Sequence, residues 1–272
     1  MYKEDFIQVD QAYFYHNYSD EPSNGFILHC HAFYEVFYFL EGNIDYRVEG
    51  TEYSLAQVSI LLIPPNTFHG VKINTSRIYH RFSIHFLPEL LSFEEQRLLL
   101  PLFRTEGTYY PAVERYRLDH FFNALLECRS AIAPLRDIAI KTRILTLLTQ
   151  IAMMSTTERA IPSAGNRAVQ EILRFINEHI QDSITLETLA DQFFISKNHL
   201  NVIFQKATGT TVNQYIRLKR LSIAQNEILR GVSASEAAAN AGFRDYSNFY
   251  RAFTSHYGHS PSQHRLPSNR IQ

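Results

Sequence analysis

The chain has 272 residues, of which 45% are apolar and 19% are charged, a composition typical of a folded globular protein. These figures exclude collagen, coiled-coil rods and wholesale disorder. A membrane helix needs ~20 apolar residues, and apolar runs such as residues 58–65 are much shorter. No apolar secretory segment opens the chain, and the two cysteines, Cys30 and Cys128, cannot build a disulfide framework. We therefore expect a cytoplasmic protein with reduced thiols and no membrane partner.

The net charge of −1 hides an asymmetry between the two halves of the chain. Residues 166–272 carry a net charge of +4, and the residues before them carry −5. A basic half joined to an acidic half indicates an anionic partner for the basic one, provided that its charges gather on one face.

Residues 1–92 alternate short aromatic and β-branched runs with turn signals such as EGN and PPN, which predicts an all-β barrel. Within them, the segment HCHAFYEVFYFLEG places His29, His31 and Glu35 at positions of one parity. On a single strand these three side chains would share one face, whereas Cys30 would face the other way. The turn segment PPNTFH then supplies His69.

The pattern H-x-H-x-x-x-E, followed by P-x-x-x-x-H, resembles the cupin barrel, although Asn66 stands where the second cupin motif has glycine. A few convergent polar groups in an apolar wall are typical of a small-molecule pocket. The predicted effector-binding residues are His29, His31, Phe33, Glu35, Tyr46 and His69, with Phe37, His80 and Arg81 as further lining candidates.

Three interpretations of this histidine-rich cluster remain open. The polar residues could hold an effector without any metal or cofactor. They could instead bind a divalent first-row transition metal, with His29, His31, Glu35 and His69 as ligands. The third interpretation is a set of structural histidines satisfied inside a packed barrel.

Residues 93–154 change to a helical pattern, with predicted helices at 114–129 and 135–154. Their apolar residues cover a wide arc, which serves packing on the barrel, a homodimer interface or both. The small, polar, proline-containing residues 155–166 form the predicted linker. The predicted architecture is therefore α+β with two domains, and the second domain spans residues 167–272.

The second domain contains an internal repeat, which predicts two helix-turn-helix units at residues 186–209 and 234–258. A long helix over TVNQYIRLKRLSIAQNEILR joins them, so that two recognition helices could enter major-groove segments ~34 Å apart. The repeated positions are Leu189-Ala190 with Ala237-Ala238, and Leu200, Phe204 and Gly209 with Phe249, Phe253 and Gly258.

The outward positions of both second helices carry hydrogen-bonding and basic side chains suited to base edges and phosphates. A generic helical bundle with solvated polar faces is the alternative, but the duplicated unit and its carboxylate-poor faces favour DNA. The predicted DNA-binding residues are Lys197, Asn198, Asn201, Gln205, Lys206, Arg244, Tyr246, Ser247, Asn248, Tyr250 and Arg251.

The segments LETLADQFFISKNHLNVIFQKATGTTVNQYI and ASEAAANAGFRDYSNFYRAFTSHYGHSPSQHR resemble the AraC/XylS family of transcription regulators. The family often has arginine where this chain has Val202, so the second unit, with Arg251, is expected to carry more of the specificity. The resemblance extends to the cupin-like sensor half that many of these regulators carry. It implies promoter DNA and a small-molecule effector, with sugars as the leading class, and a helical dimer interface in residues 93–154.

The sequence thus predicts a transcription regulator and not an enzyme, with promoter binding that responds to the effector. One alternative is a metal-dependent cupin enzyme or metal sensor tethered to a DNA-binding domain. Another is a nucleoid-type DNA binder without an effector.

Overall fold

The computed structural model describes residues 3–9, 11–19, 27–74, 78–104, 107–154 and 167–263. The predicted linker, residues 155–166, lies outside these ranges. The strands are β1 (Lys3–Val9), β2 (Ala12–Ser19), β3 (Ile27–His29), β4 (Tyr34–Glu41), β5 (Ile44–Val48), β6 (Thr51–Leu55), β7 (Ser59–Ile63), β8 (His69–Ile73), β9 (Tyr79–Phe86) and β10 (Thr108–Tyr110). The α-helices are α1 (Phe93–Leu99), α2 (Asp119–Glu127), α3 (Ala133–Met154), α4 (Arg167–Glu178), α5 (Leu186–Gln192), α6 (Lys197–Thr208), α7 (Val212–Leu229), α8 (Ala234–Asn240) and α9 (Tyr246–Tyr257).

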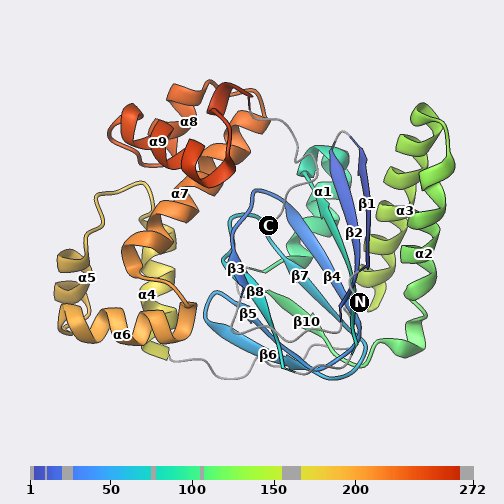
Figure 1. The fold of residues 1–272 in the computed structure, drawn as a ribbon, viewed down its shortest axis with the longest axis horizontal. Coiled ribbons are helices and arrows are strands. Elements are labelled where there is room, and N and C mark those ends of the chain that lie inside the picture. Colours follow the sequence, from blue (N-terminus) through green and yellow to red (C-terminus); the bar gives the residue numbers. More distant parts are fainter. Residues whose placement is uncertain are drawn as a thin grey trace.

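The strands form two antiparallel sheets that face each other (Figure 1). The larger sheet has the order β1-β2-β9-β4-β7-β10, and the smaller has the order β3-β8-β5-β6. Successive side chains of a strand point to opposite faces. In β4, therefore, Val36 and Tyr38 join the core beneath the helices, while Phe37 and Phe39 join the core between the sheets. Strand β7 is buried along its whole length because both of its faces are covered.

Helices α1, α2 and α3 cover the outer face of the larger sheet (Figure 1). The Phe122 ring of α2 stacks on Tyr38 of β4, with 4.6 Å between the ring centroids. The single helix predicted over residues 114–129 is wrong. Arg117 takes a left-handed conformation with φ of +51°, which ends a short 3₁₀ turn, and α2 begins only at Asp119.

The helical half contains the two predicted helix-turn-helix units, α5–α6 and α8–α9, with α7 running between them (Figure 1). The local chemistry explains each boundary of α6 and α9. The side chains of Ser196 and Asp245 accept backbone N–H groups at the two helix starts. Gly209 and Gly258 end the helices with φ of +75° and +76°, a conformation that glycine adopts without steric cost. The predicted α+β, two-domain fold class is confirmed.

The smaller sheet lies next to the helical half (Figure 1). Cys30 and Phe68 of the barrel are buried in the same apolar cluster as residues of α4, α5, α6 and α7. Within the residues that the structure describes, no helix is long and apolar enough to cross a membrane.

Candidate functional site

A cavity of about 130 Å³ lies between the two sheets of the barrel. Aromatic rings and a few polar side chains share its wall, so it offers both apolar surface and hydrogen-bonding groups. The lining residues are Tyr15, Asn17, His29, Glu35, Phe37, Tyr46, Gly70, Val71, Arg81 and His85.

Glu35 is the centre of the polar network at this cavity and is only 3% exposed. Its Oε2 lies 3.3 Å from His31 Nε2 and 3.0 Å from His69 Nε2. Its Oε1 accepts a hydrogen bond of 3.1 Å from the Ser83 hydroxyl and lies 3.5 Å from His85 Nε2. One carboxylate thus gathers groups from β8, β9 and the loop after β3.

The protonation states follow from burial and from these contacts. Burial alone would raise the pKa of Glu35, but His85 and the hydrogen bonds from His31 and His69 hold that pKa well below its usual range. Burial lowers the pKa of His31 to about 4 and also lowers that of His85. At neutral pH Glu35 is therefore ionised, and the imidazoles of His31 and His85 are neutral.

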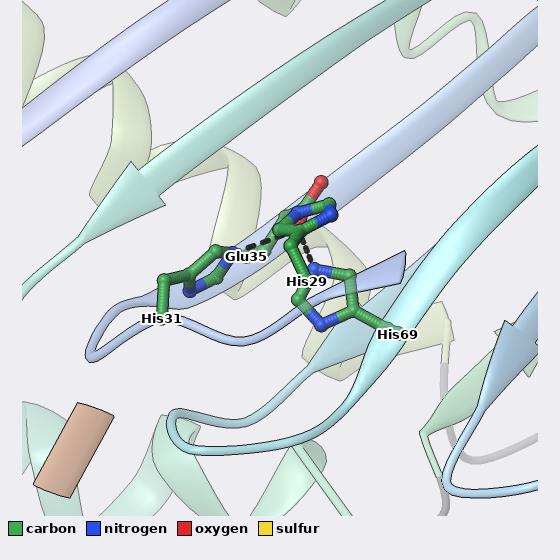
Figure 2. Close-up of side chains that lie close together, drawn as sticks. All are labelled: His29, His31, Glu35 and His69. Atoms are coloured by element: carbon green, nitrogen blue, oxygen red, sulfur yellow. Dashed lines mark hydrogen bonds and ion pairs between the residues drawn. The ribbon is translucent and has the colours of Figure 1, made fainter. Parts of the chain in front are cut away.

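The His69 ring lies between a backbone carbonyl and this carboxylate. Its Nδ1 lies 2.8 Å from the backbone carbonyl of Thr67. Its buried Nε2 lies 3.0 Å from Glu35 Oε2. The ligand atoms of His29, His31, Glu35 and His69 all lie within 4.8 Å of one another (Figure 2). Three imidazoles and a carboxylate suit a divalent first-row transition metal, so the residues present fit such an ion.

The structure brings the predicted cluster together by a different route from the one expected. His29 ends β3 in the smaller sheet, His31 lies in the following loop, and Glu35 belongs to β4 in the larger sheet. The prediction that these three side chains share one face of a single strand is therefore wrong. The side chains converge because the two sheets face each other across the cavity.

Two of the predicted lining residues lie elsewhere. Phe33 packs in a separate buried cluster, with its ring 4.9 Å from that of Tyr13. His80 has even parity in β9 and faces the helix-covered side, where its Nε2 lies 2.8 Å from that of His16. Tyr46, Phe37 and Arg81 do line the cavity, while His31 and His69 contact Glu35 at its edge.

Sequence analysis missed three polar or aromatic lining residues, Tyr15, Asn17 and His85. Tyr15 and Asn17 alternate along β2, and His85 lies opposite Tyr13 in the pairing of β2 with β9. All three have odd residue numbers, and alternate residues of a strand share one face. That pattern identifies cavity-lining residues only when the pairing of β2 with β9 is known.

The predicted DNA-binding side chains lie on one exposed part of each unit, at or before the recognition helices α6 and α9. All of them are exposed except Asn201, which is half-buried. Lys197 Nζ lies 2.7 Å from Glu187 Oε1, and Arg251 donates a hydrogen bond of 2.6 Å to Asn248 Oδ1. Both contacts are exposed to solvent, which weakens them, so these side chains can readily exchange them for contacts with DNA.

Comparison with protein families accounts for both halves. Residues 11–148 match an AraC-like ligand-binding domain, and residues 189–266 match a helix-turn-helix domain. The chain belongs to the AraC family of transcription regulators. The resemblance found in the sequence is confirmed, and the barrel and the two helix-turn-helix units correspond to the two parts of an AraC-family protein.

Among AraC-family relatives, the XylDLEGF operon transcriptional activator 2 of Pseudomonas putida is 33% identical over 36% of this chain and 65% of its own length. The HTH-type transcriptional regulator YfiF of Bacillus subtilis (strain 168) is 23% identical over 95% of this chain and 85% of its own. An apo ToxT structure from Vibrio cholerae is 12% identical over 92% of this chain and 96% of its own, with a TM-score of 0.41. The chain spans about one third to two thirds of the length of the first curated relatives it matches.

Proposed function

We propose that this chain is a sequence-specific DNA-binding transcription regulator whose promoter binding responds to a small molecule in the barrel. The observation that carries the proposal is the presence, in one chain, of a polar-lined cavity and of two helix-turn-helix units with exposed recognition residues. The helical half supplies the DNA contacts, and the barrel supplies the signal.

A sugar is the effector class that the cavity favours. Tyr15, Phe37 and Tyr46 offer faces for the apolar side of a sugar ring, and Asn17 and Arg81 offer hydrogen bonds to hydroxyl groups. The cavity of about 130 Å³ is also small beside drug-sized sites of roughly 300–1,000 Å³, which disfavours a long-chain ligand.

Thermal unfolding of the full chain against a panel of monosaccharides tests this proposal. A sugar at 100 times its Kd should stabilise the folded chain by ~2.7 kcal/mol, which raises Tm by several degrees. Asn17→Ala, in the cavity wall, should abolish the shift, and Asn43→Ala, at an exposed position, should retain it. A panel without any stabilising sugar would remove sugars as the effector class.

A metal sensor is the second candidate, favoured by three imidazoles and one carboxylate whose ligand atoms all lie within 4.8 Å of one another. His29, His31, Glu35 and His69 would hold the ion. A bound divalent cation would supply Lewis-acid character and a positive charge at the cavity, where it could orient an anionic or hydroxylated ligand.

The same unfolding experiment separates the two candidates. A chelator should lower Tm only if the purified chain carries a metal, and one divalent ion should then restore it. His69→Ala should abolish that response, and His120→Ala, at an exposed position on α2, should leave it intact. A chelator without effect and no stabilising divalent ion would remove the metal sensor.

We also propose that α3 forms a homodimer interface. Its outer face exposes Leu135, Ile138 and Met153 to between 60% and 65%, and the hydroxyls of Thr142 and Thr149 bond to their own helix. An apolar stripe of this kind fits a second copy of the same helix. Ile138→Glu should weaken self-association about tenfold or more in sedimentation equilibrium, while Val202→Glu, at an equally exposed valine, should not.

A further inference from the structure

A buried ion pair joins the barrel to the helical half. Lys219 Nζ of α7 lies 2.8 Å from Glu49 Oε1, and their side chains are only 8% and 6% exposed. The Tyr215 hydroxyl donates to the other carboxylate oxygen of Glu49, and the Phe68 backbone N–H donates to Oε1 at 2.9 Å. A buried charge without its partner is costly, so either charge alone would strongly disfavour this contact.

Two barrel residues with left-handed backbone conformations make the contact. Glu49 occupies the two-residue turn between β5 and β6 with φ of +44°, where such hairpins prefer Asn, Asp or Gly. Asn66 has φ of +58°, and its side-chain carbonyl accepts a hydrogen bond of 2.8 Å from Ser222 of α7. Both side chains reach across to α7, which explains why neither position is glycine.

The contact lies on the reverse side of the wall that carries the histidine cluster. Leu28, Cys30 and Phe68 pack against the helical half. His29 and His69, the neighbours of these residues in sequence, face the cavity instead. One thin wall therefore separates the effector site from α7.

The docked barrel also occupies the end of the first recognition helix. Arg47 Nη1 donates to the Lys206 carbonyl at 3.4 Å, and its Nη2 holds Glu52 at 2.8 Å. A methyl group added at Gly209, where α6 ends, would overlap the Leu28 side chain. A DNA backbone approaching Lys206 would meet the β5–β6 hairpin and the Glu52 carboxylate at the same place.

We propose that the cluster of Glu49, Lys219 and Tyr215 is an autoinhibitory latch that holds α7 and the first helix-turn-helix unit against the reverse side of the effector-site wall. Opening the latch frees both recognition helices to engage DNA together. The inhibitory role rests on the proposed DNA-binding function, whereas the latch itself does not.

Two full-length variants break the latch with opposite changes in charge, Glu49→Gln and Lys219→Met. The double variant leaves no unpaired buried charge and is expected to dock again. Lys141→Met, at an exposed lysine of α3, is the matched control. Maleimide alkylation of Cys30, mapped by mass spectrometry, reports docking because Cys30 is buried in the interface next to Ser222. Cys128, buried in the barrel core directly after α2, reports global unfolding.

Both single variants should speed Cys30 alkylation by about tenfold or more, without a change at Cys128, because breaking a buried ion pair strongly disfavours docking. Both should also bind a duplex selected from a random library by the wild-type chain about threefold or more tightly. The double variant and Lys141→Met should stay close to the wild type. An increase shared by two variants of opposite charge change cannot be a charge effect on DNA affinity.

Unchanged Cys30 alkylation in both single variants would overturn the latch. Faster alkylation with unchanged or weaker DNA binding would overturn its inhibitory role. If neither the wild type nor any variant selects DNA, the proposed function and the inhibitory role both fail, while the Cys30 measurement still decides whether the latch exists. If Cys128 reacts as fast as Cys30 in the single variants, the double variant decides. A latch requires the alkylation rates of Cys30 and Cys128 to return to wild-type values in the double variant.

Discussion

The two helix-turn-helix units share one scaffold but differ at the positions that decide what each unit contacts. Both recognition helices begin at a side-chain cap and end at a left-handed glycine. Yet Gly209 lies against Leu28 of the barrel, whereas no atom of the described residues lies within 4 Å of a Cβ built at Gly258. At equivalent outward positions the first unit has Val202 and the second has Arg251. We therefore expect the second unit to carry more of the DNA specificity, and the first to dock against the barrel.

The turn inside each unit differs as well. Phe194 and Gly242 occupy equivalent places, with φ of +53° and +88°. The Phe194 side chain is 95% exposed, whereas a Cβ at Gly242 would lie 2.9 Å from both Gln181 Cα and Ile180 O. The second turn is therefore enclosed by backbone, and the first is open to solvent.

The largest expected effect tests this enclosure. Gly242→Ala should lower the free energy of unfolding by about 3 kcal/mol, because a strained φ and an overlap with backbone add together. Gly231→Ala is the matched control, because Gly231 has φ of +87° but, in the part of the chain that the structure describes, no atom within 4 Å of a built Cβ. Urea unfolding of the full chain measures both. Equal losses would show that the second turn is not enclosed.

The division of specificity between the units can be tested at Arg251 and Val202. Arg251→Val should cost about 1–3 kcal/mol of specific DNA binding and relax preference at one base pair, as expected for an arginine that reads guanine. Val202→Arg should instead strengthen binding to all sequences and steepen the salt dependence by about one phosphate contact. Titrations against the selected duplex and its single-base variants measure both. An unchanged base preference in Arg251→Val would reduce Arg251 to a phosphate contact.

Alanine at the two helix-ending glycines should separate backbone strain from docking. Gly258→Ala should cost about 1 kcal/mol from its positive φ alone, and Gly209→Ala about 2 kcal/mol because Leu28 must also move. Only Gly209→Ala should increase the alkylation of Cys30. Equal stability losses with no change at Cys30 would contradict close docking at the end of α6.

The smallest expected effect is a gain in stability. Phe194→Gly should raise the free energy of unfolding by about 0.5–1 kcal/mol, because relief of the left-handed strain outweighs the extra freedom of glycine in the unfolded chain. Phe194→Ala keeps the Cβ and should change stability little. A gain of the same size in Phe194→Ala would assign the effect to the exposed ring instead of the backbone.

Local signals in the sequence were sufficient for most of the fold. Aromatic and β-branched alternation predicted the strands, and the repeat with its capping residues predicted both helix-turn-helix units. The break before α2 could not be predicted in the same way, because it depends on a left-handed Arg117 that no turn residue marks. The motif residues His29, Glu35 and His69 were found, but Tyr15 and His85 were not, since their role depends on which strands pair.

By itself, the sequence determined the periodicities, the helix caps and the recurrence of a recognition surface, because each depends on residues a few positions apart. Only the tertiary structure decided that His29 and Glu35 meet across two sheets, and that Glu49 and Lys219 meet across two domains. Such pairs join positions separated by a sheet crossing or by 170 residues. Their contacts arise from how apolar faces pack, and burial then makes the pairing of their charges decisive.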